Sequence, residues 1–266
     1  MLPVLYTIGP FSVYSFGLFL ALSFLLSTFV VWKYAREEFK EEEYLDAYFY
    51  TSLVTLVSAR IVYIIRNWPD FGLMVLKYIL VVETPGLSLI GGAIGGFIFL
   101  YLYSRKKKIK FFHFADILSL AGTLALIFIK IGQQLGGAAH GTETNSYLKV
   151  RIIGRPGFYH PTELYEAFTY LLLFILLLIL LRRAWRKKWK EGIIFAIFAF
   201  FTGVSIFGLE FLKVHRVYLY GLSFRQILAL MIITGSIFLF AGRSEIYKKF
   251  LNYFKKKKNE VSQRVA

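Results

Sequence analysis

Long uncharged runs of apolar residues alternate with short polar segments along almost the whole chain. A run of about 20 apolar residues is long enough to cross the hydrocarbon core of a bilayer as a helix. Seven runs are predicted to be such spans, and they cover residues 11–32, 44–65, 87–103, 117–135, 163–181, 192–212 and 224–241. The pattern therefore predicts an all-α integral membrane protein, folded as a bundle of seven transmembrane helices.

The segments between these runs complete the predicted organisation. Residues 73–82 are apolar but too short to cross, so this segment is expected to lie at the membrane interface or to re-enter the bilayer. The polar connection 136–158, the longest in the chain, predicts a small extracytoplasmic insertion between the fourth and fifth helices. We expect one transmembrane domain over residues 1–242, followed by a basic cytoplasmic tail over residues 243–266.

The composition narrows the classes of function. The chain is 57% apolar, above the value for a typical soluble domain, and it has no cysteine. Without cysteine there can be no disulfide, no thiolate metal site and no cysteine nucleophile in this chain. No nucleotide-binding, zinc or serine-triad spacing appears, so neither a cofactor nor a metal is expected.

The placement of charge predicts the orientation. The net charge of +16 does not indicate nucleic-acid binding, because most of the 32 Lys and Arg residues lie in short segments between the apolar runs. These are the segments 33–43, 105–110 and 182–190, together with the tail. Because cytoplasmic loops carry an excess of Lys and Arg, we expect a multi-pass plasma-membrane protein with its amino terminus outside and its carboxyl terminus in the cytoplasm.

Four predicted spans carry an ionisable residue near their outer ends. These residues are Arg60, Lys130, Glu166 and Glu210. Carboxylates are too short to reach the headgroups, so both glutamates are expected to have partners inside the bundle, and Arg60 and Lys130 are the available cations. The cluster could be a structural ion network, or a site for an anionic lipid headgroup with Arg60 or Lys130 on the phosphate.

Residues 159–166 form the densest polar cluster next to an apolar run. Pro161 suits the first turn of a helix, which would place His160 at the cap. Glu163 then falls among the unpaired N–H groups of the first turn, and we interpret it as a helix cap. Glu166 lies about one turn deeper, where a carboxylate requires a partner.

The sequence resembles the prolipoprotein diacylglyceryl transferase family over nearly its whole length. Residues 160–166 (HPTELYE) match the family's H-P-x-x-L-Y-E, which is the most specific part of the resemblance. Arg60 with Tyr63 resembles an R-x-x-Y in the second span, and residues 86–92 resemble a G-x-S-x-H-G-G stretch. Glu210 followed by Phe211 ends the sixth span as in the family's R-x-x-x-E-F.

The resemblance implies a lipid transfer at the outer leaflet. The family moves the diacylglyceryl group of phosphatidylglycerol to the lipobox cysteine thiol of a lipoprotein signal peptide, and no metal or cofactor takes part. It implies phosphatidylglycerol, the signal peptide and membrane lipids as partners. The expected catalytic residues are His160, Glu166 and Lys130. The expected substrate-binding residues are Lys130, Arg60, Gln133, Tyr165, Glu210, Gly91 and Gly92.

This sequence also departs from the family pattern. Ile90 replaces the histidine before Gly91, Lys130 replaces an arginine, Gln133 an asparagine, and Ala138 an acid. Lysine can hold a phosphate as a point charge but lacks the bidentate fork of arginine. A non-catalytic family member that binds lipid or signal peptide is therefore an alternative. A small transporter is a weaker one, because transporter sites lie near the midplane of the bilayer and these polar groups do not.

Overall fold

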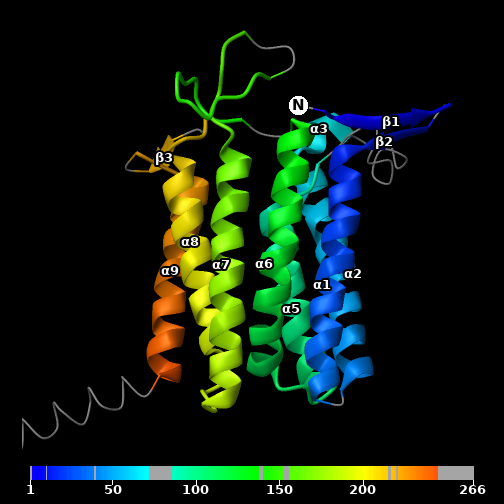
Figure 1. The fold of residues 1–266 in the computed structure, drawn as a ribbon, viewed down its shortest axis with the longest axis vertical. Helices are drawn as coiled ribbons and strands as arrows, with labels where there is room; N and C mark the ends of the chain where they lie inside the picture. The colour runs from blue at the N-terminus through cyan, green and yellow to red at the C-terminus, as the bar shows by residue number, and fades with distance from the viewer. Residues whose placement is uncertain are drawn as a thin grey trace, which may run out of the picture. The chain divides into compact units, whose positions relative to one another are not determined.

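The computed structural model describes residues 2–9, 11–38, 40–71, 86–137, 140–152, 156–214, 217–219 and 221–244. Seven helices of 18 or more residues lie within these ranges (Figure 1). They are α1 (Ser15–Glu37), α2 (Glu41–Arg66), α5 (Leu89–Lys106), α6 (Phe111–Gly136), α7 (Thr162–Arg186), α8 (Ile193–Glu210) and α9 (Phe224–Arg243), and a short helix, α3 (Trp68–Phe71), follows α2. The protein is thus all-α in its main elements, as the hydrophobic pattern predicts.

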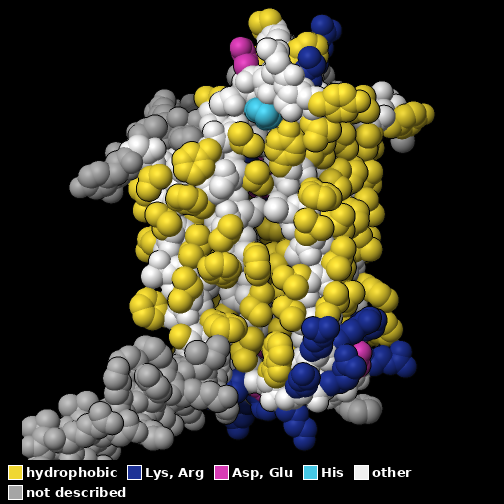
Figure 2. All heavy atoms as spheres, turned by 60° about the vertical axis from the view of Figure 1, so that its left-hand side comes forward, with side chains coloured by type: hydrophobic (Ala, Val, Ile, Leu, Met, Phe, Trp, Pro, Cys, Tyr) yellow, Lys and Arg dark blue, Asp and Glu magenta, His cyan; other side chains and the backbone are white. Residues whose placement is uncertain are grey.

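Six of these helices are long and apolar enough to cross a membrane, so the chain is a multi-pass membrane protein. The exception among the seven is α5. It carries four glycines, and Arg105 and Lys106 lie in its last turn. The space-filling view shows hydrophobic side chains over the length of the helices on the drawn face, and Lys and Arg gathered near one end (Figure 2).

Two small antiparallel hairpins accompany the helices. Strands β1 (Val4–Ile8) and β2 (Phe11–Tyr14) pair just before α1. The expected start of the first span at residue 11 is therefore wrong, because residues 11–14 form strand β2 and the helix begins at Ser15. The second hairpin pairs β3 (Val217–Leu219) with β4 (Leu222–Ser223).

The chain forms two compact units. One comprises residues 1–30 and 115–266, and the other comprises residues 31–114. The predicted interfacial segment 73–82 and the tail beyond residue 244 lie outside the described residues. The boundary proposed at residue 242 therefore stays a prediction.

In the unit of residues 31–114, α2 and α5 pack face to face. Glycines on α5 make this possible, since a Cβ added at Gly91 would overlap Val62 and one at Gly95 would overlap Ser58. A stripe of small residues lets two helix backbones approach closely. Ser88 caps α5 by accepting a hydrogen bond from the backbone N–H of Gly91 at 3.2 Å.

In the larger unit, α7 lies beside α8, and α8 lies beside α9 (Figure 1). The buried side of α7 repeats every three or four residues, as expected for a helix with one face toward its neighbours. Its members are Thr162, Glu163, Glu166, Ala167, Tyr170, Leu173, Leu177, Leu181 and Ala184. This stripe begins with polar residues and continues with apolar ones, so the polar site lies at one end of the helix.

A buried carboxylate fixes the start of α8. Asp116 of α6 accepts hydrogen bonds from the backbone N–H groups of Gly192 and Phe195, both at 2.7 Å. Gly192 has a φ of 91°, a left-handed conformation that favours glycine. Because N–H groups at the beginning of a helix have no partner within the helix, Asp116 serves as a cap supplied by a neighbouring helix.

Candidate functional site

Four buried charged side chains meet at the end of α7 where the polar connection 137–161 enters (Figure 1). Lys130 Nζ lies 2.6 Å from Glu163 Oε2 and 2.6 Å from Glu166 Oε2. Lys213 Nζ lies 2.6 Å from Glu163 Oε1 and 2.5 Å from Glu166 Oε1. The two lysines therefore alternate with the two glutamates in a closed arrangement. We call these four side chains, Lys130, Lys213, Glu163 and Glu166, the Lys–Glu ring.

Helix geometry brings the two carboxylates together. The first residue of α7 is Thr162, so Glu163 and Glu166 lie three positions apart and project from the same face. Lys130 reaches them from α6, within two turns of its end at Gly136. Glu166 therefore has a partner inside the bundle, as predicted, and of the two candidate cations Arg60 and Lys130 this partner is Lys130.

Lys213 reaches the ring from the segment after α8, and the polar connection holds that segment in place. Gly141 pairs with Lys213 in an antiparallel bridge, and the N–H of Thr142 donates to the carbonyl of Leu212 at 2.8 Å. A side chain at Gly141 would collide with the carbonyl of Leu212, which lies 2.7 Å from the position of an added Cβ. Glycine is therefore required where the connection crosses this segment.

The ring has no net formal charge, yet all four of its side chains are at least 91% buried, the most exposed being Lys130 at 9%. Burying a charge is unfavourable unless it is paired, and each group here has two oppositely charged neighbours. The N-terminal end of α7 adds a favourable partial positive charge next to the carboxylates. Removal of one member would leave a buried charge without its full complement.

The ring corrects the interpretation of Glu163 as a helix cap. The N-cap of α7 is Pro161, which makes no side-chain cap, and the Glu163 carboxylate binds the two lysines instead. Lys213 is the ring residue that is missing from the predicted site, because it lies just beyond the predicted span 192–212 and no local pattern in the sequence marks it.

Glu210 has a different partner from those expected. Its Oε2 lies 3.2 Å from an Arg225 guanidinium nitrogen, and its Oε1 accepts a hydrogen bond from the Ser223 hydroxyl at 3.2 Å. Ser223 is also the N-cap of α9 and forms a capping box with Gln226. The expectation that Arg60 or Lys130 would pair with Glu210 is therefore wrong, since the partner comes from the first turn of α9.

His160 and Tyr165 form a second polar pair, which is more exposed than the ring. In the sequence both lie within a few residues of Glu163 and Glu166. His160 Nδ1 lies 3.3 Å from the Tyr165 hydroxyl, which donates to the carbonyl of Leu148 at 3.3 Å. Both side chains are only partly buried, and neither contacts a ring lysine in the part of the chain that the structure describes. His160 is therefore available to exchange a proton without disturbing an ion pair.

The two glutamines after Lys130 differ in burial. Gln134 is buried, and its Oε1 has no hydrogen-bond partner among the described residues, whereas Gln133 is only partly buried. A buried carbonyl oxygen without a donor is unfavourable and marks a place for one to bind. Gln134 is therefore a stronger candidate than the predicted Gln133 for a contact with substrate.

The remaining predicted residues lie in the unit of residues 31–114. Arg60 is buried, donates a hydrogen bond to the carbonyl of Gly86 at 3.1 Å, and lies 5.8 Å from the centre of the Tyr63 ring. Gly91 and Gly92 face α2, where they allow the close helix contact described above. A role for these glycines in substrate binding stays a prediction.

A search against protein families matches the model described as "Prolipoprotein diacylglyceryl transferase" over residues 3–241. The chain belongs to the prolipoprotein diacylglyceryl transferase family. Among its relatives, the phosphatidylglycerol–prolipoprotein diacylglyceryl transferase of Clostridioides difficile (strain 630) is 29% identical over 261 residues, covering 98% of each chain. The enzyme of the same name from Tolumonas auensis is 31% identical over 216 residues, covering 79% of this chain and 82% of the relative.

Membership of the prolipoprotein diacylglyceryl transferase family confirms the resemblance carried by residues 160–166. A third relative, from Finegoldia magna, is 29% identical and covers 89% of this chain. Within the described residues, no group of three or more His, Asp or Glu side chains is placed to hold a metal ion. Both glutamates of the Lys–Glu ring belong to the motif of residues 160–166, and Lys130 and Lys213 complete the ring.

Proposed function

We propose that this protein transfers the diacylglyceryl group of phosphatidylglycerol to the thiol of the lipobox cysteine in a lipoprotein signal peptide, and that the Lys–Glu ring is the centre of this site. The observation that carries the proposal is the burial of two lysines and two carboxylates at the start of α7, within the family's motif. Two ammonium groups in one water-poor site suit a phosphate whose charge grows during the reaction.

We infer an orientation from the distribution of charge. The bundle has seven spans, with α5 as the third, and the amino terminus lies outside the plasma membrane while the carboxyl terminus lies in the cytoplasm. The ring then lies near the outer leaflet, beneath an extracytoplasmic insertion formed by residues 137–161. Phosphatidylglycerol reaches this depth from the leaflet itself, and a signal peptide reaches it after export.

The reaction requires a nucleophile, which is the cysteine thiol, and a leaving group, which is glycerol phosphate. The cysteine thiol loses a proton, its sulfur forms a bond to the glyceryl carbon, and the bond from that carbon to the phosphate oxygen breaks. The electron pair leaves with glycerol phosphate, whose negative charge increases as the bond breaks. Lys130 and Lys213 bind the phosphate oxygens and stabilise this developing charge.

The two carboxylates hold the lysines in position. Glu163 and Glu166 each contact both ammonium groups, so either lysine can turn toward a phosphate while it keeps one carboxylate partner. His160 is the group that we assign as proton acceptor for the thiol, because it is partly exposed and makes no ion pair within the described residues. Tyr165 orients the imidazole through its hydroxyl.

Mass spectrometry tests the transfer directly. Purified protein with phosphatidylglycerol and a lipobox peptide should convert the peptide to a form that carries one diacylglyceryl group on its cysteine. A peptide with serine in place of that cysteine is the control and should stay unmodified. No conversion under conditions where the protein binds both substrates would overturn the proposal.

A non-catalytic role in lipid or peptide binding is the second candidate. The observation that favours it is the complete mutual pairing of the ring, in which both lysines are already occupied by carboxylates. In that case the peptide would bind and remain unmodified, and binding would be unaffected by Lys130→Arg.

A further inference from the structure

The opposite end of α7 carries a second polar feature. A cavity of about 400 Å³ is lined by Arg183, Arg186, Lys187 and Trp189. All four side chains are exposed, and none of the three cations forms an ion pair with a described residue. The cavity thus combines uncompensated positive charge with one aromatic ring, and no acidic residue lines it.

The backbone here is built to hold this arrangement. The N–H of Trp189 donates to the carbonyl of Ala184 at 2.9 Å, and the N–H of Lys188 donates to the carbonyl of Trp185 at 3.4 Å. These are the two bonds of a Schellman motif, which folds the chain back over the last turn of a helix. The fold-back brings the indole of Trp189 next to cations of the preceding turn.

Lys188 occupies the left-handed position of this motif, with a φ of 49°. Glycine is usual there, because other residues are strained in that conformation. A lysine in this place adds a charge at the expense of backbone strain.

An apolar track on the same side of α7 leads to the cavity. Leu172, Ile175 and Ile179 are all more than 45% exposed, and Arg183 follows Ile179 by four positions. Side chains three or four positions apart share a face of a helix, so exposed apolar groups run directly into the cationic group. A phospholipid has the complementary order of groups, with apolar acyl chains followed by an anionic phosphate.

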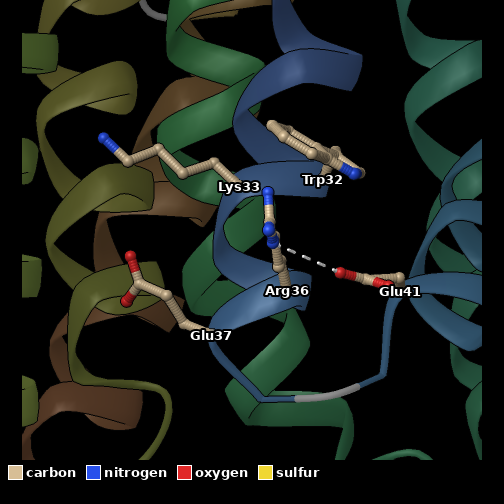
Figure 3. Close-up of a pocket in the computed structure, with 5 residues that line it drawn as sticks. All are labelled: Trp32, Lys33, Arg36, Glu37 and Glu41. Carbon is tan, nitrogen blue, oxygen red and sulfur yellow. Dashed lines mark ion pairs between the residues drawn. The ribbon is translucent and has the colours of Figure 1, made fainter.

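A second cavity provides a contrast. It is lined by Trp32, Lys33, Arg36, Glu37 and Glu41 (Figure 3). There the Arg36 guanidinium lies 5.5 Å from the centre of the Trp32 ring and 3.9 Å from Glu41, and the cations are matched in number by acids. Aromatic and basic residues occur in both cavities, but only the one at the end of α7 has a net positive lining.

We propose that the cavity of Arg183, Arg186, Lys187 and Trp189 binds the phosphate of an anionic phospholipid from the leaflet that surrounds this end of α7, with the acyl chains along the track that ends at Ile179. This site is separate from the Lys–Glu ring and does not depend on the proposed transfer activity. Basic pockets at the membrane surface bind anionic headgroups in this way, and tryptophan favours the headgroup level.

Photolabelling in nanodiscs tests the site. A phosphatidylglycerol analogue with a diazirine on its headgroup should label the peptide of residues 182–192. The triple variant Arg183→Ala, Arg186→Ala, Lys187→Ala should lower this labelling about 100-fold, since each cation near the headgroup contributes roughly fivefold. Replacement by Arg183→Lys and Arg186→Lys should retain it, because the charge is kept.

The end of α5 provides a matched control. Lys108 has a φ of 57°, and the N–H of Ile109 donates to the carbonyl of Ser104 at 2.9 Å, so the same Schellman motif is present with the buried Ile109 in place of Trp189. Lys106→Ala, Lys107→Ala, Lys108→Ala removes the same charge and should leave labelling of residues 182–192 within twofold.

Three results would overturn the proposal. They are an equal loss of labelling in the α5 control, equal labelling by the matching phosphatidylcholine analogue, and complete displacement of the label by millimolar inorganic phosphate. The last result would show a site for free phosphate rather than for a lipid.

Discussion

The two ends of α7 differ in how their charged side chains are accommodated: they are buried and paired at one end, and exposed at the other. At the first end, Glu163 and Glu166 are 2% exposed and each contacts two lysines. At the other end, Arg183, Arg186 and Lys187 are exposed and make no ion pair among the described residues. Both arrangements suit the helix dipole, which favours anions at the start and cations at the end.

The difference shows how burial separates two uses of charge. Exposed cations at a helix end contribute little to stability and mainly set orientation and attract anionic lipid. A buried network depends on all of its members, so the loss of one is unfavourable for both folding and function. We therefore expect large effects at the first end of α7, and substitutions in the Lys–Glu ring, at His160 and at His113 test how far this distinction holds.

The largest effect is expected from Lys130→Ala. It removes a phosphate ligand and leaves two buried carboxylates with one cation, so transfer to the lipobox peptide should become undetectable. The free energy of unfolding should fall by about 3–5 kcal/mol. Lys130→Arg keeps the charge and should retain stability and measurable transfer. Full activity of Lys130→Ala would remove Lys130 from the site.

The next largest effect is expected from His160→Ala. Loss of a proton acceptor typically lowers a rate by about 10²–10⁴-fold, and the transfer rate should fall by this amount. Because His160 lies outside the Lys–Glu ring, the melting temperature should hardly change.

Tyr165→Phe is the matched control for this pair, since it removes only the hydroxyl that contacts His160. Its rate should fall less than that of His160→Ala. Equal transfer by His160→Ala and the native protein would instead assign the proton to Glu166.

A double-mutant cycle on Glu163 and Lys213 tests whether the ring acts as a unit. Glu163→Gln and Lys213→Met each leave unbalanced buried charge, whereas the double variant is again neutral. Contacting charged groups typically couple by about 0.5–3 kcal/mol, so the double variant should be more stable than the sum of the single losses predicts. Additive losses, measured by chemical unfolding, would show that the four side chains do not form one network.

The smallest effect is expected at an ion pair of intermediate exposure. Glu38, just after α1, contacts His113 and accepts a hydrogen bond from Tyr44 at 2.8 Å. Burial alone would raise the pKa of Glu38, but the hydrogen bonds from His113 and Tyr44 outweigh it and hold the pKa below its ordinary value of 4.5. Because the folded-state pKa is lowered, this stabilisation is present above pH 4.5 and is lost as the pH falls through the folded value.

His113→Ala should therefore lower the free energy of unfolding by less than about 1 kcal/mol at neutral pH. The difference from the native protein should shrink as the pH falls below 4.5. Unfolding curves at several pH values measure this, and Tyr44→Phe, which removes one hydrogen bond to the same carboxylate, is the comparison. A difference that grows toward acid pH would contradict the assignment.

Much of the fold could be predicted from the sequence because membrane helices are encoded locally. Long apolar runs identify the helices, and Glu166 in such a run predicts a buried partner, which Lys130 provides. The hydrophobic pattern predicts a helix over residues 11–14, where the structure has a strand, because strand and helix are hard to distinguish in a short apolar run. The close contact of α2 and α5 follows from the glycine pattern that starts at Gly91.

The part of the site that the sequence did not reveal depends on pairing between distant segments. Lys213 lies beyond a span, and its bridge with Gly141 helps to place it against Glu163. Arg225 lies in the first turn of the predicted seventh span, and the start of α9 places it against Glu210. Nothing local in the sequence distinguishes these two cations from those that face water, because the distinction arises from burial by other elements.

The central claim is that a lysine of the Lys–Glu ring binds the phosphate of the lipid substrate. Solid-state NMR of protein with ¹⁵Nζ-labelled lysine in phosphatidylglycerol bilayers measures the dipolar coupling between lysine nitrogen and lipid phosphorus. We predict a coupling at direct-contact distance that disappears in Lys130→Arg, while transfer to the peptide continues. An unchanged set of couplings in Lys130→Arg would contradict the assignment of Lys130 to the phosphate.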